Sequence, residues 1–188
     1  MSRFAGTWAL TRFALRRDRL LIPVWIIVFV LSTVSTASAT MALYPDTTSR
    51  TIAATGVNEV PVAVAFYGRI WDPTSLGALS LLKLGGFGGA MVAILAIMLV
   101  TRHTRAEEEK GRTELIGATV VGEWAWIAAA LTVTTATMLA IGILSGVGLI
   151  AVGLPSTGSM AFGLAWATMG MSFAPTAAVT AWPSGSSA

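Results

Sequence analysis

A chain of 188 residues is long enough for one soluble domain, but 55% hydrophobic and only 11% charged residues are the composition of a membrane protein. From Trp124 to Ala188 there is no Asp, Glu, Lys or Arg, and because a soluble protein could not cover its surface with so few charges, a soluble enzyme is excluded. The net charge of +3 is concentrated beside apolar runs, which favours anionic lipid over nucleic acid as the partner.

The first 19 residues are basic and predict a helix that lies on the inner surface of the membrane. Five arginines in 1–19 would each gain about 1 kcal/mol from an anionic surface. The apolar stripe of this helix is incomplete, so the helix is moderately amphipathic. Residues 20–43 contain no ionisable group and span roughly 36 Å as a helix, enough to cross a hydrocarbon core of about 30 Å. We expect a first transmembrane helix here, since the run exceeds the apolar core of a cleavable signal peptide.

Residues 44–75 are more polar and are expected to form an external segment. Asp46 and Thr47 are expected to cap a short helix in this segment, and Gly56 to end it. The apolar run 76–101 predicts a second transmembrane helix that is interrupted only by Lys83. The long side chain of Lys83 can reach the outer interface; the alternative is that its ammonium group faces a substrate path.

The segment 102–123 is charged and has the most informative pattern in the chain. Thr104 and Glu107 form a capping box for a short helix, within which Glu108 pairs with Arg112. Placing the glutamates in hydrocarbon would cost about 2.5 to 3.5 kcal/mol each, so this helix is expected in the cytoplasm. The residues alone leave two interpretations open, a solvated loop that only follows the topology and a docking surface for a partner.

The charge-free C-terminal part is long enough for two further transmembrane helices. Residues 124–153 and 160–181 are the predicted third and fourth spans, and 154–159, rich in Pro, Ser and Gly, is the external turn between them. The predicted fold is therefore all-α, with four transmembrane helices preceded by an interfacial amphipathic helix.

The distribution of Lys and Arg predicts the orientation of these helices. The segments 1–19 and 102–123 carry most of the positive charge, whereas 44–75 carries little, so the positive-inside rule places the first two in the cytoplasm. With four spans the tail 182–188 returns to the same side, and both termini are expected to be cytoplasmic.

Glycine pairs and isolated motifs suggest helix packing rather than chemistry. The stretch 146–151 matches G-x-G-x-x-A but follows no strand, and no P-loop is present. The sequence has no cysteine and one histidine, His103, which is expected to be a satisfied interfacial residue. It therefore offers no metal site and no catalytic group. Two G-x-x-x-G spacings would let helices approach closely in lipid; their members are Gly85, Gly89, Gly142 and Gly146.

Three passages carry a resemblance to a known family. They are ALRRDRLLIPVW at 14–25, the stretch 80–122 with its RHTRAEEEKGRTELI sequence, and AAVTAW at 177–182. The chain resembles the membrane (permease) subunit of actinobacterial ABC exporters of the antibiotic and multidrug type, such as the tetronasin exporters. The likeness covers nearly the whole chain and is loosest in 44–75, with Ile116 where leucine is commoner.

The resemblance implies a partner and a role for the charged loop. In such exporters this loop forms a coupling helix that docks on a separate ATP-binding subunit, so ATP would be held by the partner and this chain would have no cofactor and no enzymatic activity of its own. Residues 1–19 would be the elbow helix. The docking surface implied by the resemblance consists of Arg105, Glu107, Glu108, Glu109, Gly111, Arg112, Glu114 and Leu115.

The resemblance also implies more helices than the chain contains. Such permeases typically have six spans per half, so this chain looks truncated after the fourth, and the remaining helices would come from a C-terminal half or from a second copy. The expected function is outward transport of amphipathic drugs, antibiotics or lipids, because charge-free walls suit hydrophobic cargo. The alternative is a transport-incompetent membrane scaffold that binds a partner through the same helix; an intramembrane enzyme is disfavoured because no paired catalytic groups are present.

Overall fold

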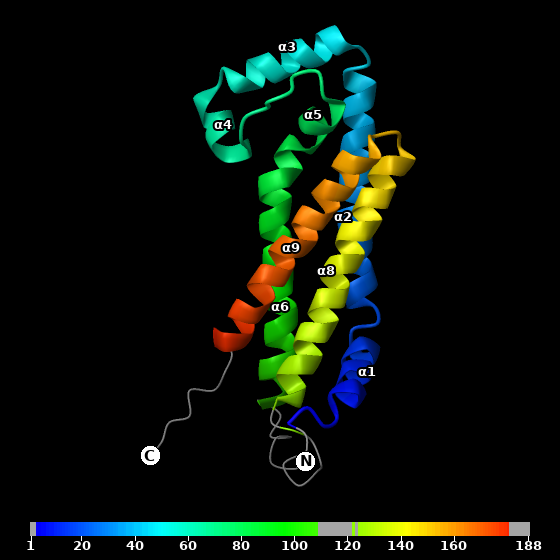
Figure 1. The fold of residues 1–188 in the computed structure, drawn as a ribbon, viewed down its shortest axis with the longest axis vertical. Coiled ribbons are helices and arrows are strands. Elements are labelled where there is room, and N and C mark those ends of the chain that lie inside the picture. Colours follow the sequence, from blue (N-terminus) through cyan, green and yellow to red (C-terminus); the bar gives the residue numbers. More distant parts are fainter. Residues whose placement is uncertain (1–2, 109–121, 123, 181–188) are drawn as a thin grey trace.

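The computed structural model describes residues 3–108, 122 and 124–180, with the backbone alone at 105–108. All regular elements in this part are helices, which confirms the predicted all-α fold. Figure 1 shows the long helices running along one axis, with α1 near one end and α3 across the other; these are called the α1 end and the α3 end below. In chain order the helices are α1 (Thr7–Arg17), α2 (Leu21–Leu43), α3 (Thr47–Asn58), α4 (Pro61–Tyr67), α5 (Leu76–Lys83), the π-helical turn η1 (Leu84–Gly88), α6 (Gly89–Glu108), α8 (Ala125–Ala151) and α9 (Ser156–Thr180).

Three helical stretches among the described residues are long and apolar enough to cross a membrane: Leu21–Leu43, Leu76–Thr104 and Ala125–Ala151. They coincide with the first three predicted spans; α9, the predicted fourth span, is not among them. α9 has 25 residues and no charge, but seven Ser and Thr, three Gly and Pro175 make it less apolar than the others. The prediction of a fourth span relies on the lack of charge, which does not by itself make a helix apolar.

The main buried cluster lies where α2, α6, α8 and α9 meet. Its largest fully buried aliphatic side chains are Leu99 of α6 and Met138 and Ile141 of α8. Trp166 of α9, only 2% exposed, completes the cluster and contacts Phe29 of α2 edge-on. The four long helices therefore share one core.

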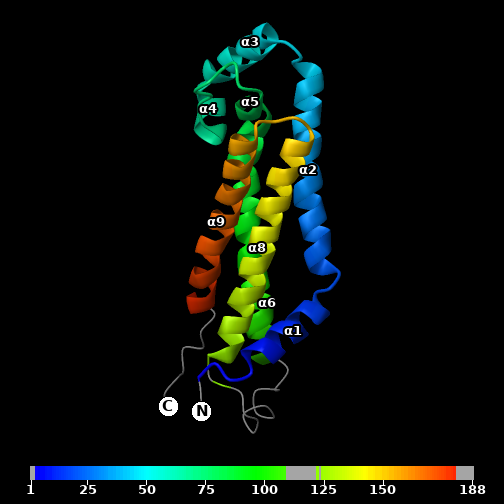
Figure 2. The same ribbon diagram turned by 45° about the vertical axis from the view of Figure 1, so that its right-hand side comes forward.

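Glycines allow α8 and α9 to pack closely. Gly142 and Gly163 face each other, and a Cβ atom on either one would overlap the carbonyl oxygen of the other. One turn further along α8, a Cβ at Gly146 would lie 2.9 Å from Sδ of Met160 and 3.1 Å from the carbonyl oxygen of Ser159. Only glycine permits this backbone approach, and Figure 2 shows the two helices side by side.

The second apolar stretch contains a π-helical turn, η1, between α5 and α6. The turn places Gly88 and Gly89 against α9, where a Cβ atom would overlap Trp166 and contact Met169 respectively. A Cβ at Gly85 would meet no atom within 4 Å. Residues four apart share a face in an α-helix but not across an i→i+5 turn, so Gly85 and Gly89 do not form a common packing face.

The α3 end is held by side-chain hydrogen bonds to the backbone. Asp46 accepts a hydrogen bond of 2.8 Å from the amide of Ser49 and caps α3 as predicted. The predicted end of this helix at Gly56 is wrong, since α3 continues to Asn58. The amide group of Asn58 then makes two hydrogen bonds of 2.9 Å with the backbone of Ile70, which attach the following loop to α3.

Two predicted boundaries differ from the structure. α6 continues without a break to Glu108, so the predicted helix start at Thr104 is wrong. The hydroxyl of Thr104 donates to the carbonyl of Val100, 3.0 Å away, inside the helix. α9 begins at Ser156, within the predicted turn 154–159. At Thr104 the local capping signal is outweighed by the continuation of α6.

Candidate functional site

A buried carboxylate joins the segment after α1 to α6. Asp18 is 1% exposed, and its Oδ1 lies 3.0 Å from Nε of Arg102 while its Oδ2 lies 3.2 Å from Nε2 of His103. The neighbouring Arg17 also donates to the carbonyl oxygen of Arg102, at 3.4 Å. These contacts fix the C-terminal end of α1 to the point where α6 passes into the charged segment.

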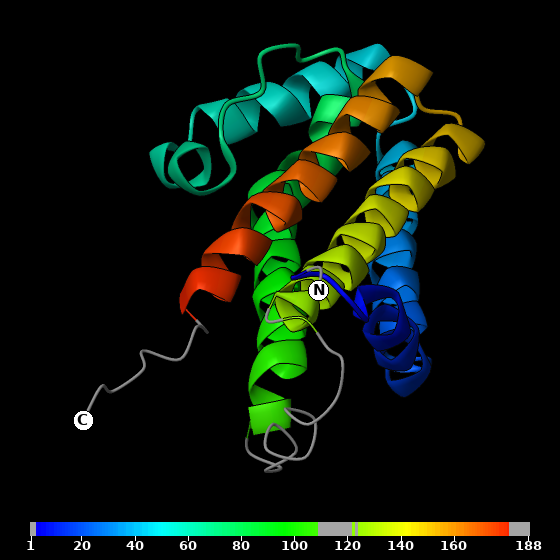
Figure 3. The same cartoon turned by 60° about the horizontal axis from the view of Figure 1, so that its bottom comes forward.

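The other end of α1 is attached to the far end of the same charged segment. The carbonyl of Ala5 accepts a hydrogen bond of 2.9 Å from the amide of Gly122, and that of Arg3 accepts one of 3.1 Å from the amide of Trp124. Between these two attachments α1 packs against α8, as Figure 3 shows. We call the set Arg3, Ala5, Asp18, Arg102, His103, Gly122 and Trp124 the α1 junction. It links both ends of the segment 102–124 to one helix.

Of the predicted docking residues, only those at the end of α6 fall within the described part. Arg105, Glu107 and Glu108 lie in the last turns of that helix, where the backbone alone is described. The others lie outside the described residues: Glu109, Gly111, Arg112, Glu114 and Leu115. The structure therefore places the two ends of the predicted coupling segment, but not the segment itself.

Sequence reasoning misses Asp18 as the centre of the α1 junction. It is the single acidic residue in the basic run 16–19, next to a transmembrane helix, and an isolated carboxylate there requires a cationic partner once it is buried. That requirement is the signal that could have found it, although the partner lies 84 residues away along the chain.

An apolar cavity of about 310 Å³ opens between α2, η1, α6 and α9. None of the described residues that line it is charged. Half of them are aromatic or contain sulfur, and Ser32 adds a hydroxyl that donates to the carbonyl of Phe29 at 2.9 Å. We call it the side groove; its lining is Trp25, Val28, Phe29, Ser32, Leu84, Phe87, Gly88, Met91, Ile94, Leu95, Met98 and Trp166.

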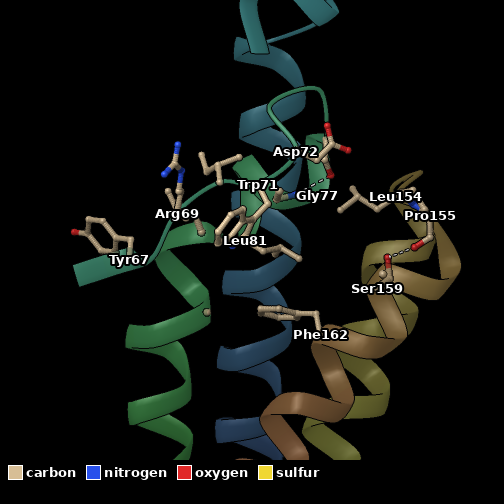
Figure 4. Close-up of a pocket in the computed structure, with 16 residues that line it drawn as sticks. Tyr67, Arg69, Trp71, Asp72, Gly77, Leu81, Leu154, Pro155, Ser159 and Phe162 are labelled. Atoms are coloured by element: carbon tan, nitrogen blue, oxygen red, sulfur yellow. Dashed lines mark hydrogen bonds between the residues drawn. The ribbon is translucent and has the colours of Figure 1, made fainter. Parts of the chain in front are cut away.

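A larger cavity of about 500 Å³ lies at the α3 end, between the loop after α4, α5 and the start of α9. Figure 4 shows its labelled residues, with Arg69, Trp71 and Asp72 on the loop at the top of the view and Phe162 of α9 below them. The guanidinium of Arg69 lies 5.6 Å from the Trp71 ring, a cation–π distance. We call this the end cavity, and in contrast to the side groove it carries charges of both signs.

Asp72 is held in its ionised form by its neighbours. The hydroxyl of Thr74 donates to Oδ1 at 2.6 Å and the amide of Thr74 donates to it at 3.0 Å. These hydrogen bonds, the hydroxyl's first, lower the pKa of Asp72 below its ordinary value of 3.8. These hydrogen bonds therefore favour the ionised form of the carboxyl group at the end cavity.

Lys83 is exposed and lines a third cavity, of about 480 Å³, between α2, α3 and α5. Its position at the end of α5, near the α3 end, gives its ammonium group a short route out of the apolar region. The same position also puts it beside a cavity, so both interpretations made from the sequence remain open.

Comparison with known proteins identifies the family. A family model for the C-terminal domain of the multidrug efflux system permease Rv1217c matches residues 9–182. The chain belongs to this family. The multidrug efflux system permease protein Rv1217c of Mycobacterium tuberculosis is 42% identical over 182 residues, which are 96% of this chain and 33% of that relative. The chain therefore spans about a third of the length of the curated relative it matches.

Family membership and the three long apolar helices together make this a multi-pass protein of the plasma membrane. The resemblance to multidrug permeases inferred from the sequence is thus confirmed at the level of the family. Neither cavity nor the α1 junction was predicted from the sequence, because each depends on contacts between helices that are distant along the chain.

Proposed function

We propose that the chain is the membrane part of an ABC exporter that moves amphipathic drugs, antibiotics or lipids outward, driven by ATP hydrolysed on a separate subunit. Efflux is the activity named for the relative from Mycobacterium tuberculosis. The apolar side groove supports hydrophobic cargo, since an ion would require charged groups in the membrane.

The α1 junction is the observation that carries this proposal. A partner that displaces the segment 102–124 would also displace α1, which is attached to both of its ends. α1 leads directly into α2, so the displacement would reach the wall of the side groove. Transfer through packed helices that adopt two arrangements is how transporters alternate between states.

The proposal places the α1 end in the cytoplasm and lets α9 cross the membrane as a fourth helix. Its 25 residues extend over roughly 37 Å, and its close packing on α8 offsets its lower hydropathy. Because the chain has no native cysteine, single replacements report the orientation. Gly56→Cys on α3 should react with an impermeant thiol reagent outside intact cells, and Arg16→Cys on α1 only after permeabilisation; the reverse pattern would refute both the topology and the coupling.

Docking is tested by reversing the charges of the predicted coupling segment. The variant Glu107→Lys, Glu108→Lys, Glu109→Lys should reduce the amount of ATP-binding subunit that co-purifies with the tagged chain by at least about tenfold, a loss of roughly 1.4 kcal/mol. Glu59→Lys is the matched control, since Glu59 is an exposed acidic residue at the α3 end. Equal co-purification of the triple variant and the control would contradict the docking surface.

Transport is tested separately from docking. Cells that carry the gene should accumulate less of an amphipathic dye than cells that lack it, and the difference should disappear with the triple variant. A chain that binds the ATP-binding subunit but leaves accumulation unchanged would instead be the membrane scaffold considered above.

A further inference from the structure

The side groove has the chemistry of a site for a flat aromatic molecule. Its walls place the Phe29 ring 6.0 Å from Trp25 and 5.6 Å from Trp166, measured between ring centroids. Met91 and Met98 supply flexible thioethers on the opposite wall. Aromatic rings favour stacked or edge-on contacts, and methionine adapts to ligands of differing shape. The volume of about 310 Å³ falls within the range of small-molecule sites.

One polar atom of the groove has no partner among the described residues. Nε1 of Trp166 is fully buried and meets no hydrogen-bond acceptor. A Cβ atom on Gly88 would overlap the six-membered ring of this indole, and one on Gly89 would lie 4.0 Å from its Cδ1, so the indole lies against the junction of η1 and α6. An unsatisfied buried donor is costly, and neither a lipid acyl chain nor an aliphatic helix face could satisfy it.

The rim of the groove is apolar and lies on the flank of the long helices, the face that we expect to meet lipid. Val28, Phe87 and Ile94 on its rim are 48%, 66% and 55% exposed on the flank of the helices. Because the described lining has no charge, a charged ligand would lose its hydration without compensation. A neutral molecule dissolved in the membrane meets neither obstacle.

From these observations we infer that the side groove is a binding site for neutral, flat aromatic molecules that carry a hydrogen-bond acceptor and enter from the lipid. The Trp166 N–H donates to that acceptor, and the aromatic ring of the ligand stacks among the aromatic side chains of α2. The inference deepens the proposed export function by naming a substrate class and its site. Binding itself requires no ATP and no partner subunit, so it can be measured apart from transport.

Benzophenone is a suitable probe because it is a neutral diaryl ketone and reacts on irradiation. Its excited carbonyl takes a hydrogen atom from a nearby C–H bond, and the two carbon radicals then join, so each adduct marks a contact. In irradiated membranes that contain the protein, adducts should form saturably at Met91 and Met98. Met169 and Met171 of α9, which do not line the groove, serve as internal controls for labelling from bulk lipid.

The acceptor requirement is tested by competition and by one conservative variant. Deoxybenzoin should compete about fivefold to tenfold better than bibenzyl, which has the same shape without the carbonyl. Trp166→Phe should abolish that difference while keeping an aromatic ring, and Trp126→Phe, outside the groove, should leave it intact. Thermal unfolding of both variants verifies that they fold.

Several outcomes would overturn the inference. Non-saturable labelling spread over all lipid-exposed methionines would show partitioning into the membrane only. Absence of adducts at Met91 and Met98 in the native membrane would show that another helix covers the groove. Equal competition by the two compounds would show that the Trp166 N–H does not bind the acceptor. A failure of docking or of dye export alone would refute the proposed function but leave this site unaffected.

Discussion

The rings of Phe162 and Trp166 lie 4.7 Å apart, one turn from each other on α9. Phe162 lines the end cavity, and Trp166 lines the side groove. The aromatic pair therefore stands between an apolar space open to lipid and a charged space at the α3 end. η1 also lines both spaces: Gly85 lines the end cavity, and Gly88 lines the side groove.

Removing the Phe162 ring should connect the two cavities. With Met91→Cys as the reporter in the groove, Phe162→Ala should raise its rate of modification by a charged, impermeant thiol reagent at least about tenfold, because the reagent then reaches the thiol through water. Gly158→Cys, in open space at the end cavity, should react equally in both backgrounds. An unchanged rate at Met91→Cys would mean that the aromatic pair does not separate the cavities.

The glycine contact between α8 and α9 should tolerate no side chain. Gly163→Ala places a methyl group against the carbonyl oxygen of Gly142 and should destabilise the protein by about 1–3 kcal/mol, since two packed backbones must separate. Gly158→Ala lies on the same helix where a Cβ meets nothing within 4 Å and should have little effect. Unfolding in increasing denaturant compares the two, and equal midpoints would contradict the contact.

The carboxylate of Asp18 should be coupled energetically to Arg102. Asp18→Asn should destabilise the protein by about 1–3 kcal/mol, because a buried ion pair loses one partner; Arg102, with 42% of its side chain exposed, limits the loss. A double-mutant cycle with Arg102→Gln should give a coupling energy of about 0.5–3 kcal/mol. Additive effects of the two substitutions would show that the pair does not hold α1 to α6.

The cap of α3 should depend on pH. The amide of Ser49, followed by its side chain, lowers the pKa of Asp46 below 3.8. A group with a lowered folded pKa adds stability above its unfolded value, and that stability is lost as the pH falls through the folded value. Hydrogen exchange at the Ser49 amide should therefore accelerate relative to neighbouring amides below about pH 4, whereas Asp46→Asn should show no such step.

Features that depend on neighbouring residues could be predicted from the sequence. Long apolar runs with few or no charges identify α2, the α5–α6 stretch and α8, because hydrocarbon excludes ionised groups whatever the fold. The cap at Asp46 was predictable because it is also local: its partner Ser49 is three residues away. The lack of charge in α9 is not sufficient to predict a span, because its serines and threonines lower its hydropathy.

Features that depend on distant residues could not be predicted. The partner of Asp18 lies 84 residues away, and the side groove needs α2, α6 and α9 to be placed together. The π turn does have a local signal: three of its five residues are glycine, which lowers the cost of leaving the α-helical path. The contact face of α8, by contrast, follows from the spacing of Gly142 and Gly146, whereas their neighbour Gly163 on α9 does not.

The π turn between α5 and α6 has a mechanical consequence. It holds one residue more than an α-helical turn of the same rise. If that surplus residue migrated along the helix, the side chains it passed would rotate by about 100°, while both helix ends kept their places. Phe87, at the edge of the groove, would then rotate across its opening. This change needs no hinge and no rigid-body tilt of the helices.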